Sequence, residues 1–411
     1  MPEFSPFAGV RYDCGAAGAE LDALVAPPYD VVDDDQCAAL EAADPHNSVR
    51  LILPRDEAAD GDRYERAAET FAQWRAEGVL ITDAAPRFYA YRMTFTDAHG
   101  VARHTRGVIG ACALPEPGAT DVLPHERTLP KAKSDRLALL SAMRVNVDPI
   151  WGLSLANGLS ALTEGATPLA SCHDSDGFGH ELGAIDDPAS ITAISELVAS
   201  SPLVLADGHH RFETAINYRA ERRAAGTADP GAGAILMLVV ELVDDELCIE
   251  AIHRLVDLPA GVELRDRLAE AFEIRDMGPN TPDGVDALEQ AMHAEGALGI
   301  VDPHGLALAI PRPAARRAAL DGEHPAVAAT DAAVVETMVV PHLPGATFDY
   351  RHDAHAVAAL VDKANASAAI FCSPVSVAQT RWAAVDGVRM PQKTTFFAPK
   401  PRTGMVFRTL D

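Results

Sequence analysis

The chain has few cysteines, and no two of them form a Cys-x-x-Cys pair. Such pairs are typical of zinc knuckles and thiol redox motifs, and dense, even sets of cysteines are typical of disulfide-stabilised secreted domains. The spacing argues against all three. We interpret the cysteines as reduced, mostly buried small side chains. They stand at positions 14, 37, 112, 172, 248 and 372.

Basic charge is also scarce. Lys and Arg together number 34 and Asp and Glu together number 60, so the formal net charge is −26. A surface of this sign repels nucleic acid, because duplex binding needs clustered cations that displace counterions. A local basic pocket inside an acidic protein would suit a small anion better than a polymer. We therefore expect a small-molecule substrate and no nucleic-acid partner.

The sequence lacks long hydrophobic runs and shows no targeting signal. Its first residues, MPEFSPFAGVRYD, have no basic stretch followed by an apolar one, so no signal peptide is expected. The longest apolar stretch, at residues 232–240, is too short to span a bilayer. We predict a cytoplasmic protein with no membrane partner. No feature of the sequence indicates its oligomeric state.

The length of 411 residues is too great for one ordinary core, which predicts two or three domains. Short strand-like runs alternate with Ala-rich helical stretches. They suggest an N-terminal α+β region at 1–115, a core at 116–260 and a C-terminal α+β region at 261–411. Strands with crossover helices beside antiparallel hairpins predict a mixed α/β or α+β architecture.

Hydrophobic periodicity predicts several individual elements. The alternating pattern of residues 48–54 predicts a strand. Residues 63–77 are expected to form a helix with their apolar side chains on one face. A helix is also expected at 134–144. Residues 233–242 and 247–256 flank an acidic turn, which suggests a β-hairpin.

The segment ADGHHRFET, at 206–214, carries the strongest functional signal. A buried strand ends in its aspartate, the glycine permits a tight turn or a close backbone approach, and the histidines and arginine occupy the first turn of a helix. That turn offers backbone N–H groups and the positive end of the helix dipole. We therefore predict an anion site, most naturally for phosphate. Its residues are Asp207, Gly208, His209, His210 and Arg211.

A purely structural interpretation of the same segment is also open. Asp207 would cap the helix, Glu213 would complete the cap, and both histidines would be surface residues. The spacing does not match a P-loop, which has Gly-x-x-x-x-Gly-Lys followed by Ser or Thr. We favour the functional interpretation, because two histidines and an arginine meet at one strand-to-helix turn.

A second cluster, PHERTLPKAKSDR at 124–136, combines possible general bases with a hydroxyl group and cations. Phosphoryl transfer needs cations against developing charge and one base for the attacking hydroxyl. His125 or Glu126 would be the base, and Lys133 and Arg136 are among the cations. The alternative is an exposed charged loop that leads into a helix.

Two pairs further along the chain give weaker signals. His253 and Arg254 end a strand that follows the anion loop; they would line the same cleft or form a surface pair, and we favour the surface pair. His352 and His355 lie three positions apart at a helix start, but no third metal ligand is apparent.

The C-terminal stretch offers hydroxyl and ammonium groups. Residues 393–395 read Lys-Thr-Thr, and Lys400 follows. These groups would face phosphate or solvent, and we favour solvent.

These stretches resemble the family catalogued as domain of unknown function 1015. The matching stretches follow one another along nearly the whole chain. They are 26–31 (APPYDV), 46–48 (HNS), 124–128 with 133–136, 206–214, 253–254, 393–397 and 399–400. The family name implies no settled activity.

The Asp-Gly-His-His-Arg turn also resembles, more distantly, the phosphate-binding turn of the ParB/sulfiredoxin superfamily. The resemblance implies a ParB/sulfiredoxin-like core with flanking α+β regions and a nucleotide bound at the turn. One branch of that superfamily phosphorylates free serine and uses an acidic residue well upstream of the turn as base. Glu126 is the matching candidate here. Those relatives are shorter and lack the flanking regions.

Together these features predict a nucleotide-dependent phosphotransferase with a free-serine-kinase-like core, which acts on a small hydroxyl-bearing metabolite. The expected cofactors are ATP or ADP and Mg²⁺. The expected catalytic residues are Glu126, His125 and Asp207. The expected nucleotide-binding residues are Gly208, His209, His210, Arg211, Lys133, Arg136, His253 and Arg254.

Two alternatives belong to other functional classes. A metal-dependent hydrolase would use Asp207, His209, His210 and His125 as ligands, although adjacent histidines rarely point at one metal. A non-catalytic nucleotide-binding regulator would bind nucleotide without converting it.

Overall fold

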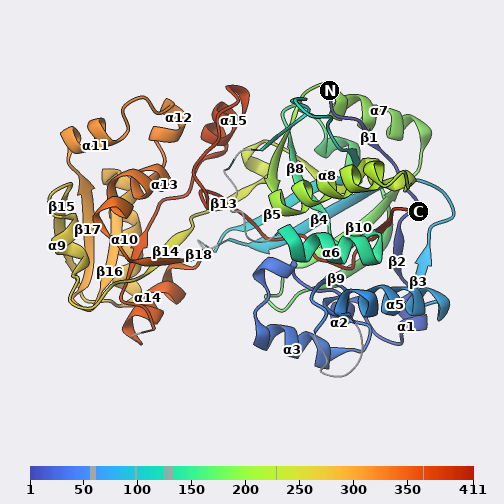
Figure 1. Ribbon diagram of the computed structural model, residues 1–411, viewed down its shortest axis with the longest axis horizontal. Coiled ribbons are helices and arrows are strands. Elements are labelled where there is room, and N and C mark those ends of the chain that lie inside the picture. Colours follow the sequence, from blue (N-terminus) through green and yellow to red (C-terminus); the bar gives the residue numbers. More distant parts are fainter. Residues whose placement is uncertain (56–61, 98–99, 125, 127–132, 228, 364) are drawn as a thin grey trace. The chain divides into compact units, whose positions relative to one another are not determined.

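The computed structural model describes residues 1–55, 62–97, 100–124, 126, 133–227, 229–363 and 365–411 (Figure 1). The described residues form two compact units. Unit 1 comprises Met1–Pro124, Thr128–Cys248 and Pro399–Asp411, and unit 2 comprises His125–Arg127 and Ile249–Ala398. The chain therefore returns to unit 1 at its C-terminal end.

This division differs from the three regions expected from the sequence, 1–115, 116–260 and 261–411. Strand pairing explains the difference, because β5 (Ala102–Ala113) and β12 (Ala234–Glu241) lie side by side in one sheet. Sequence periodicity reports each strand but not its partner, so regions far apart in the sequence were assigned to separate bodies.

Unit 1 is built on a mixed sheet, which counts nine strands among the described residues. The strands run in the order β6-β11-β8-β12-β5-β4-β10-β9, and β1 pairs with β5. Their bounds are β1 Phe4–Ser5, β4 Phe88–Thr96, β5 Ala102–Ala113, β6 Val122–Pro124, β8 Ile150–Ser154, β9 Thr167–His173, β10 Gly179–Ile185, β11 Leu203–Asp207 and β12 Ala234–Glu241. Shorter strands pair separately: β2 Val10–Tyr12 with β3 Leu80–Thr82, and β7 Val145–Asn146 with β21 Arg408–Thr409.

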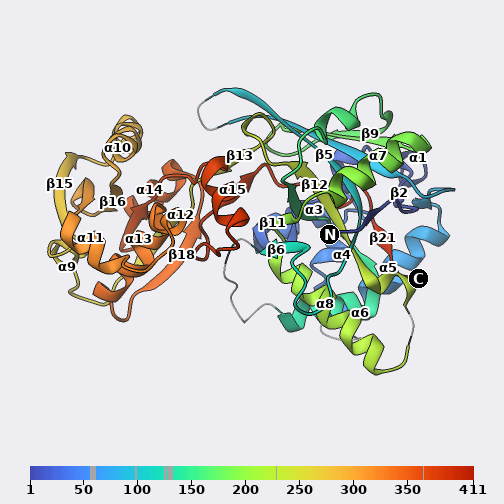
Figure 2. The same cartoon turned by 90° about the horizontal axis from the view of Figure 1, so that it is seen from above.

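Helices complete unit 1. In both views α6 and α8 lie side by side (Figures 1 and 2). Phe212 and Ala215 of α8 pack with Ile150 and Leu205 of the sheet in one hydrophobic cluster. The helices are α1 Cys14–Ala17, α2 Leu21–Leu24, α3 Asp34–Ala43, α4 Val49–Ile52, α5 Arg63–Ala76, α6 Lys133–Met143, α7 Pro188–Ala199 and α8 His209–Ala224.

Unit 2 contains a second sheet, of six strands among the described residues, in the order β15-β17-β16-β19-β14-β18. Alternate residues of β16 and β17 join two different hydrophobic clusters, so both faces of this sheet are covered. The six strands are β14 His253–Asp257, β15 Phe272–Gly278, β16 Leu298–Asp302, β17 Gly305–Pro311, β18 Thr347–Arg351 and β19 Ala368–Phe371. Two further strands, β13 Cys248–Glu250 and β20 Phe396–Ala398, pair separately. The helices are α9 Leu264–Leu268, α10 Pro282–Glu295, α11 Pro313–Ala319, α12 Pro325–Ala328, α13 Asp331–Val334, α14 Ala354–Asp362 and α15 Val377–Val385.

The α+β class expected from the sequence is confirmed, and so is the helix expected at 63–77, which runs Arg63–Ala76. Two local predictions are wrong. Residues 48–54 hold the short helix α4 rather than a strand, and the expected hairpin of 233–242 with 247–256 does not form. β12 pairs with β5 and β8, whereas β14 pairs with β18 and β19.

Two expectations about the chain as a whole concern its cysteines and membranes. All six cysteines are free, and four of them are buried, as their spacing predicted: Cys37, Cys112, Cys172 and Cys372. Among the described residues, every helix is too short or too polar to cross a bilayer.

Candidate functional site

The loop between β11 and α8 lies in unit 1 beside the end of β8. β11 is buried along Leu203 to Ala206 and pairs with β8 on one side and with β6 on the other. Its last residue, Asp207, is followed by the N-cap Gly208, which has the left-handed conformation (φ 83°, ψ 27°). Because glycine has no side chain to cap the helix, the first turn of α8 keeps its positive end toward the loop.

Gly208 is required by space as well as by conformation. A Cβ atom at this position would lie 2.6 Å from Cγ2 of Ile150. We expect Gly208→Ala to lower the free energy of unfolding by about 3 kcal/mol, from overpacking and the left-handed φ together. Urea unfolding measures this. Gly226→Ala is the matched control, since its φ is +65° but the space around it is open, and it should cost about 1 kcal/mol. Equal losses in the two variants would contradict the close approach.

The side chain of Arg211 is fixed by three acceptors. Its Nη1 donates to Oδ2 of Asp148 at 2.6 Å and to the carbonyl oxygen of Pro149 at 2.9 Å, and its Nη2 donates to Oδ2 of Asp207 at 3.0 Å. The other oxygen of Asp207 accepts from Nζ of Lys400 at 2.6 Å. The side chains of Arg211 and Lys400 are each only 10% exposed, so these ion pairs are shielded from solvent.

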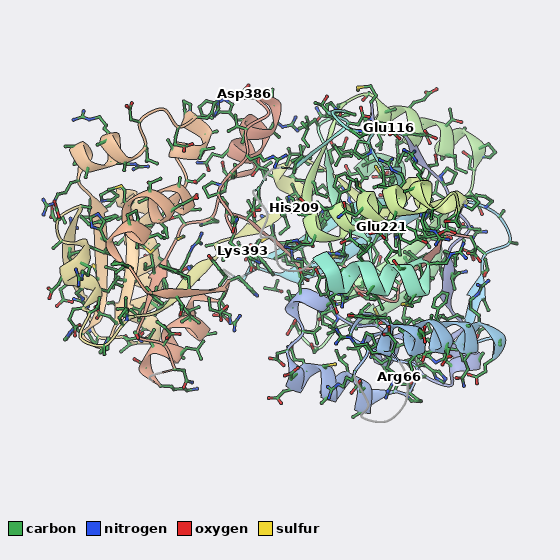
Figure 3. All side chains as sticks on the ribbon, viewed as in Figure 1. Arg66, Glu116, His209, Glu221, Asp386 and Lys393 are labelled. Atoms are coloured by element: carbon green, nitrogen blue, oxygen red, sulfur yellow. The ribbon has the colours of Figure 1, made fainter. Side chains whose placement is uncertain are left out.

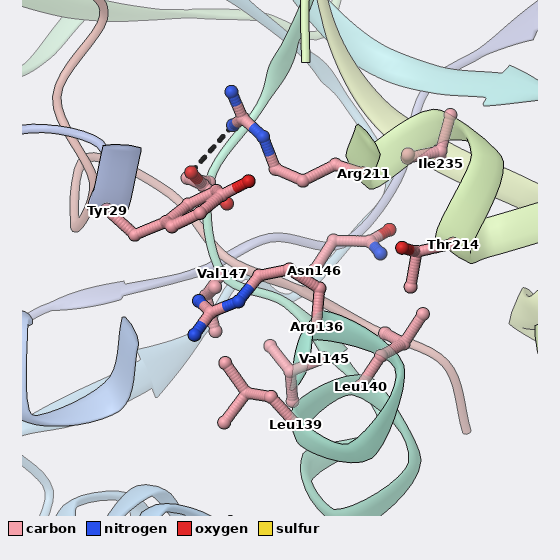
Figure 4. Close-up of a pocket in the computed structure, with 11 residues that line it drawn as sticks. Tyr29, Arg136, Leu139, Leu140, Val145, Asn146, Val147, Arg211, Thr214 and Ile235 are labelled. Atoms are coloured by element: carbon pink, nitrogen blue, oxygen red, sulfur yellow. Dashed lines mark hydrogen bonds and ion pairs between the residues drawn. The ribbon is translucent and has the colours of Figure 1, made fainter. Parts of the chain in front are cut away.

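A second guanidinium, that of Arg136, contacts the same aromatic ring as Arg211. The ring of Tyr29 lies between Arg136 and Arg211, with guanidinium carbons 4.3 Å and 5.9 Å from its centroid (Figure 4). Arg136 is 8% exposed and donates to the carbonyl oxygen of Ile52 and to Asp135. The cation–π contact helps to hold Arg136 in place, and Asp135 is its carboxylate partner.

These groups border a cavity of about 50 Å³. One part of its wall is polar and includes Asn146 and Asp148, and another part is apolar and includes Leu139 and Leu140 (Figure 4). A water molecule needs about 10–15 Å³ of such space, so the cavity has room for a few waters or a small chemical group and not for a whole nucleotide.

Two carboxyl groups of this cluster have oppositely shifted pKa values. Burial raises the pKa of Asp148, and the charge of Arg211 offsets this only in part. Burial would also raise the pKa of Asp207, but the charges of Lys400 and Arg211 outweigh it and lower that pKa to about 2. Neighbouring acids whose environments separate their pKa values are typical of acid–base sites.

The lowered pKa of Asp207 predicts a pH dependence of stability. Because the folded-state pKa lies below the unfolded value of about 3.9, ionised Asp207 contributes about 2–3 kcal/mol above about pH 4, and this is lost as the pH falls toward 2. We expect the stability difference between the wild type and Asp207→Asn to shrink over that range in urea unfolding. Asp148 titrates in both proteins, but the charge of Asp207 helps to raise its pKa, so the contribution of Asp148 cancels only in part. A difference that does not change with pH would contradict the assignment.

The sequence-predicted residues of the loop are found together. His209 and His210 are half-buried in the first turn of α8, next to Asp207 and Arg211 in the sequence. Figure 3 labels His209. The structural interpretation of this segment is wrong in one respect: Gly208, not Asp207, is the N-cap, and the carboxylate of Asp207 pairs with Arg211 and Lys400.

Other predicted residues have their contacts in unit 2. Both oxygens of Glu126 accept hydrogen bonds from residues 393–395. His253 and Arg254 are 1% and 4% exposed, so the favoured surface pair is wrong. Burial first, and then the charge of Arg254, lowers the pKa of His253 to about 3, which keeps this imidazole neutral.

Two of the predicted site residues are not described or are described only in part. His125 lies outside the described residues, and Lys133 is described only as the first residue of the α6 backbone. Within the described ranges, no group of three or more His, Cys, Asp and Glu side chains has the arrangement to hold a metal ion. His352 pairs with Glu250 and His355 with Asp286, so these histidines have separate partners.

Sequence reasoning missed Asp148 and undervalued Lys400. Lys400 was assigned to solvent, yet it forms a buried ion pair with a residue 193 positions away. Asp148 stands two positions before the first residue of the buried strand β8, in the sequence Val-Asp-Pro-Ile. A carboxylate at the end of a buried strand was the available signal, but strand ends often carry aspartate for turn formation alone.

Comparison with known proteins identifies the family of the chain. A sequence profile of the family described as "Protein of unknown function (DUF1015)" matches residues 4–333. A search of curated proteins finds no match.

Several solved structures show a weak likeness. A free serine kinase variant in complex with AMP is 13% identical, with a TM-score of 0.38, covering 68% of this chain and 84% of that one. A conserved hypothetical protein from Pyrococcus furiosus is 12% identical, with a TM-score of 0.38, covering 71% and 92%. SbnI from Staphylococcus aureus, truncated at its C-terminus, is 12% identical, with a TM-score of 0.36, covering 72% and 85%. Another free serine kinase structure contains ADP.

Proposed function

The chain belongs to the DUF1015 family of proteins of unknown function, and from its own residues we propose that it binds the phosphate groups of a nucleotide at the start of α8 and transfers phosphoryl to a small hydroxyl-bearing metabolite. The observation that carries this proposal is the fixed guanidinium of Arg211 at the first turn of that helix. The cytoplasmic location and small-molecule substrate expected from the sequence are part of the same proposal.

The geometry of Arg211 suits a phosphate ligand. Its contacts with Asp148, Pro149 and Asp207 use three of its five N–H donors, so among the described residues two donors are left for a ligand. A planar guanidinium binds two phosphate oxygens at once, and its entropic cost is low when neighbours already hold it in place. The helix dipole adds positive potential at the same point.

Two more cations lie at the site, and each is paired with a carboxylate. Arg136 and Lys400 bring two more cations close to Arg211 from distant parts of the chain. Developing charge on a transferring phosphoryl group is stabilised best by donors that are already oriented and shielded from water. The buried position of all three cations supplies that shielding.

Asp148 is our candidate for the proton acceptor. In the proposed step the oxygen of the acceptor hydroxyl forms a bond to the γ-phosphorus, and the bond from that phosphorus to the β,γ-bridging oxygen breaks. The hydroxyl proton passes to Asp148, and the nucleoside diphosphate leaves with the electron pair. The raised pKa of Asp148 brings its proton affinity closer to that of a useful general base than an exposed aspartate would have.

This proposal differs from one part of the sequence-based scheme. Glu126 was expected as the base, and its role stays a prediction. Asp148 has the stronger support, because it shares Arg211 with the proposed phosphate site, whereas both oxygens of Glu126 already accept hydrogen bonds from residues 393–395.

Mg²⁺ fits the donor set only in part. This ion is usually held by one or two carboxylates together with substrate phosphates and water. Asp207 and Asp148 are the carboxylates at the site, and both pair with Arg211. When bound with the nucleotide, Mg²⁺ would supply further charge neutralisation at the phosphates.

Phosphorus NMR tests the proposed reaction. The protein is incubated with ATP, Mg²⁺ and a panel of small hydroxyl compounds that includes hydroxyl amino acids, sugars and polyols. We expect a new phosphomonoester resonance and an equal amount of ADP with at least one acceptor class. Bound nucleotide that stays unconverted with every acceptor would identify a non-catalytic nucleotide-binding protein and exclude the transferase.

A further inference from the structure

Residues 391–395 of unit 2 wrap around a carboxylate. The backbone N–H of Lys393 donates to one oxygen of Glu126 at 3.1 Å. The N–H groups of Thr394 and Thr395 donate to its other oxygen at 3.1 Å and 2.8 Å, and Oγ1 of Thr395 donates to the same oxygen at 2.7 Å. Three consecutive backbone N–H groups that converge on one anion form a nest, which is a recurring anion-binding arrangement.

The loop adopts a rare conformation to form this nest. Lys393 has φ +55°, one of two positive values among the described non-glycine residues. A non-glycine residue in this region costs about 1–3 kcal/mol and persists only where its surroundings impose it. The hydroxyl of Thr394 donates to the carbonyl oxygen of Pro391 at 2.7 Å, which closes the loop from the other side.

A buried cation supports the same loop. Nη2 of Arg254 donates to the carbonyl oxygen of Lys393 at 3.0 Å, and this arginine is only 4% exposed. Within the described part of the chain, no carboxylate lies at ion-pair distance from its guanidinium. Its charge therefore adds to the positive potential of the nest instead of being cancelled by a carboxylate partner.

We propose that residues 393–395 form a second anion-binding site, specific for a phosphate or carboxylate group, which Glu126 occupies as an internal ligand. The nest offers four donors directed at two oxygen atoms, and any oxyanion with that spacing satisfies them. Glu126 is half-buried, so an external anion can reach the position that its carboxylate holds. An external oxyanion binds there in competition with Glu126.

Removing the internal ligand tests the proposal. In the full-length protein with Glu126→Ala, inorganic phosphate is titrated while the backbone amide resonances of Lys393, Thr394 and Thr395 are followed by NMR. We expect saturable shifts of these three resonances and at least about tenfold tighter binding at this loop than in the wild type, equal to about 1.4 kcal/mol. Acetate, titrated in parallel, separates a carboxylate preference from a phosphate preference.

Controls separate this site from the one at α8. Glu263→Ala removes another glutamate of unit 2, which pairs with His304 on the surface, and should leave the response of the three amides as weak as in the wild type. Glu126→Ala with Thr395→Val should bind phosphate more weakly than Glu126→Ala alone, because one donor is lost.

Amides of 393–395 that do not respond to either anion in folded Glu126→Ala would overturn the proposal. If that variant is unfolded, Glu126→Gln provides the second test. Its neutral amide is a poorer ligand for the nest, so added phosphate should displace it and shift the same three resonances, and a lack of shift would again count against the site. The shifts of these amide resonances do not depend on nucleotide binding at Arg211, so the two proposals can fail separately.

Discussion

Arg211→Ala is expected to weaken nucleotide binding by at least about 100-fold, because two charge-assisted hydrogen bonds to phosphate are lost at about 1.5–3 kcal/mol each. The guanidinium is held at the first turn of α8 by Asp148 and Asp207, so no other side chain can take its exact geometry. Isothermal titration calorimetry with ATP and ADP measures the change.

Two further variants make this result specific. Arg223→Ala removes an arginine from the same helix whose side chain is 60% exposed and pairs with Glu116, and it should bind nucleotide as the wild type does. Arg211→Ala also leaves Asp148 without its cation and Asp207 with Lys400 alone, which destabilises the fold. Arg211→Lys keeps the charge and loses the fork, and should weaken binding about tenfold. Wild-type affinity in folded Arg211→Ala would contradict the site.

Asp148→Asn is expected to lower the turnover of phosphoryl transfer by about 10²–10⁴-fold, the usual contribution of a general base. The amide keeps the size of the side chain and one oxygen acceptor for Arg211, so the nucleotide Kd should change by only a few fold. Single-turnover kinetics with the acceptor identified by phosphorus NMR separate the chemical step from binding.

The same kinetics for Glu126→Gln distinguish the two candidate bases. If Asp148 is the proton acceptor, its variant shows the larger loss and a changed dependence of turnover on pH. A large loss in Glu126→Gln with normal turnover in Asp148→Asn would restore the base assignment made from the sequence.

Sequence reasoning located the anion loop because its signals are local. A buried strand, a glycine, and an arginine in the first helical turn are all encoded within residues 203–211, and the structure has β11, Gly208 and α8 in that order. The left-handed φ of Gly208 also follows from local sequence, since glycine adopts it at low cost. The family was identified on the same kind of short stretches.

The rest of the site depends on contacts between distant residues. Lys400 meets Asp207 only because the last segment of the chain returns to unit 1. Tyr29 and Arg136 form their contact across more than a hundred residues of chain. A charged residue on a short segment reads as solvent-exposed when its partner is unknown, and for this reason Lys400 was assigned to solvent.

The wrong secondary structure has a related cause. An acidic turn between two apolar runs favours a hairpin locally, but β12 is buried along Ile235–Glu241 and gains more by pairing with β5 and β8 inside the sheet. The short apolar run at 48–54 fits a strand or a helix equally well. Asn47 decides it, because its Oδ1 accepts from the N–H of Val49 and starts the turn of α4.

The most direct test of the central claim is a crystal structure of the chain with ADP and Mg²⁺. The account predicts phosphate oxygens within hydrogen-bond distance of the Arg211 guanidinium and of backbone N–H groups in the first turn of α8. A nucleotide bound elsewhere, or a site that stays without nucleotide at saturating ADP, would contradict it.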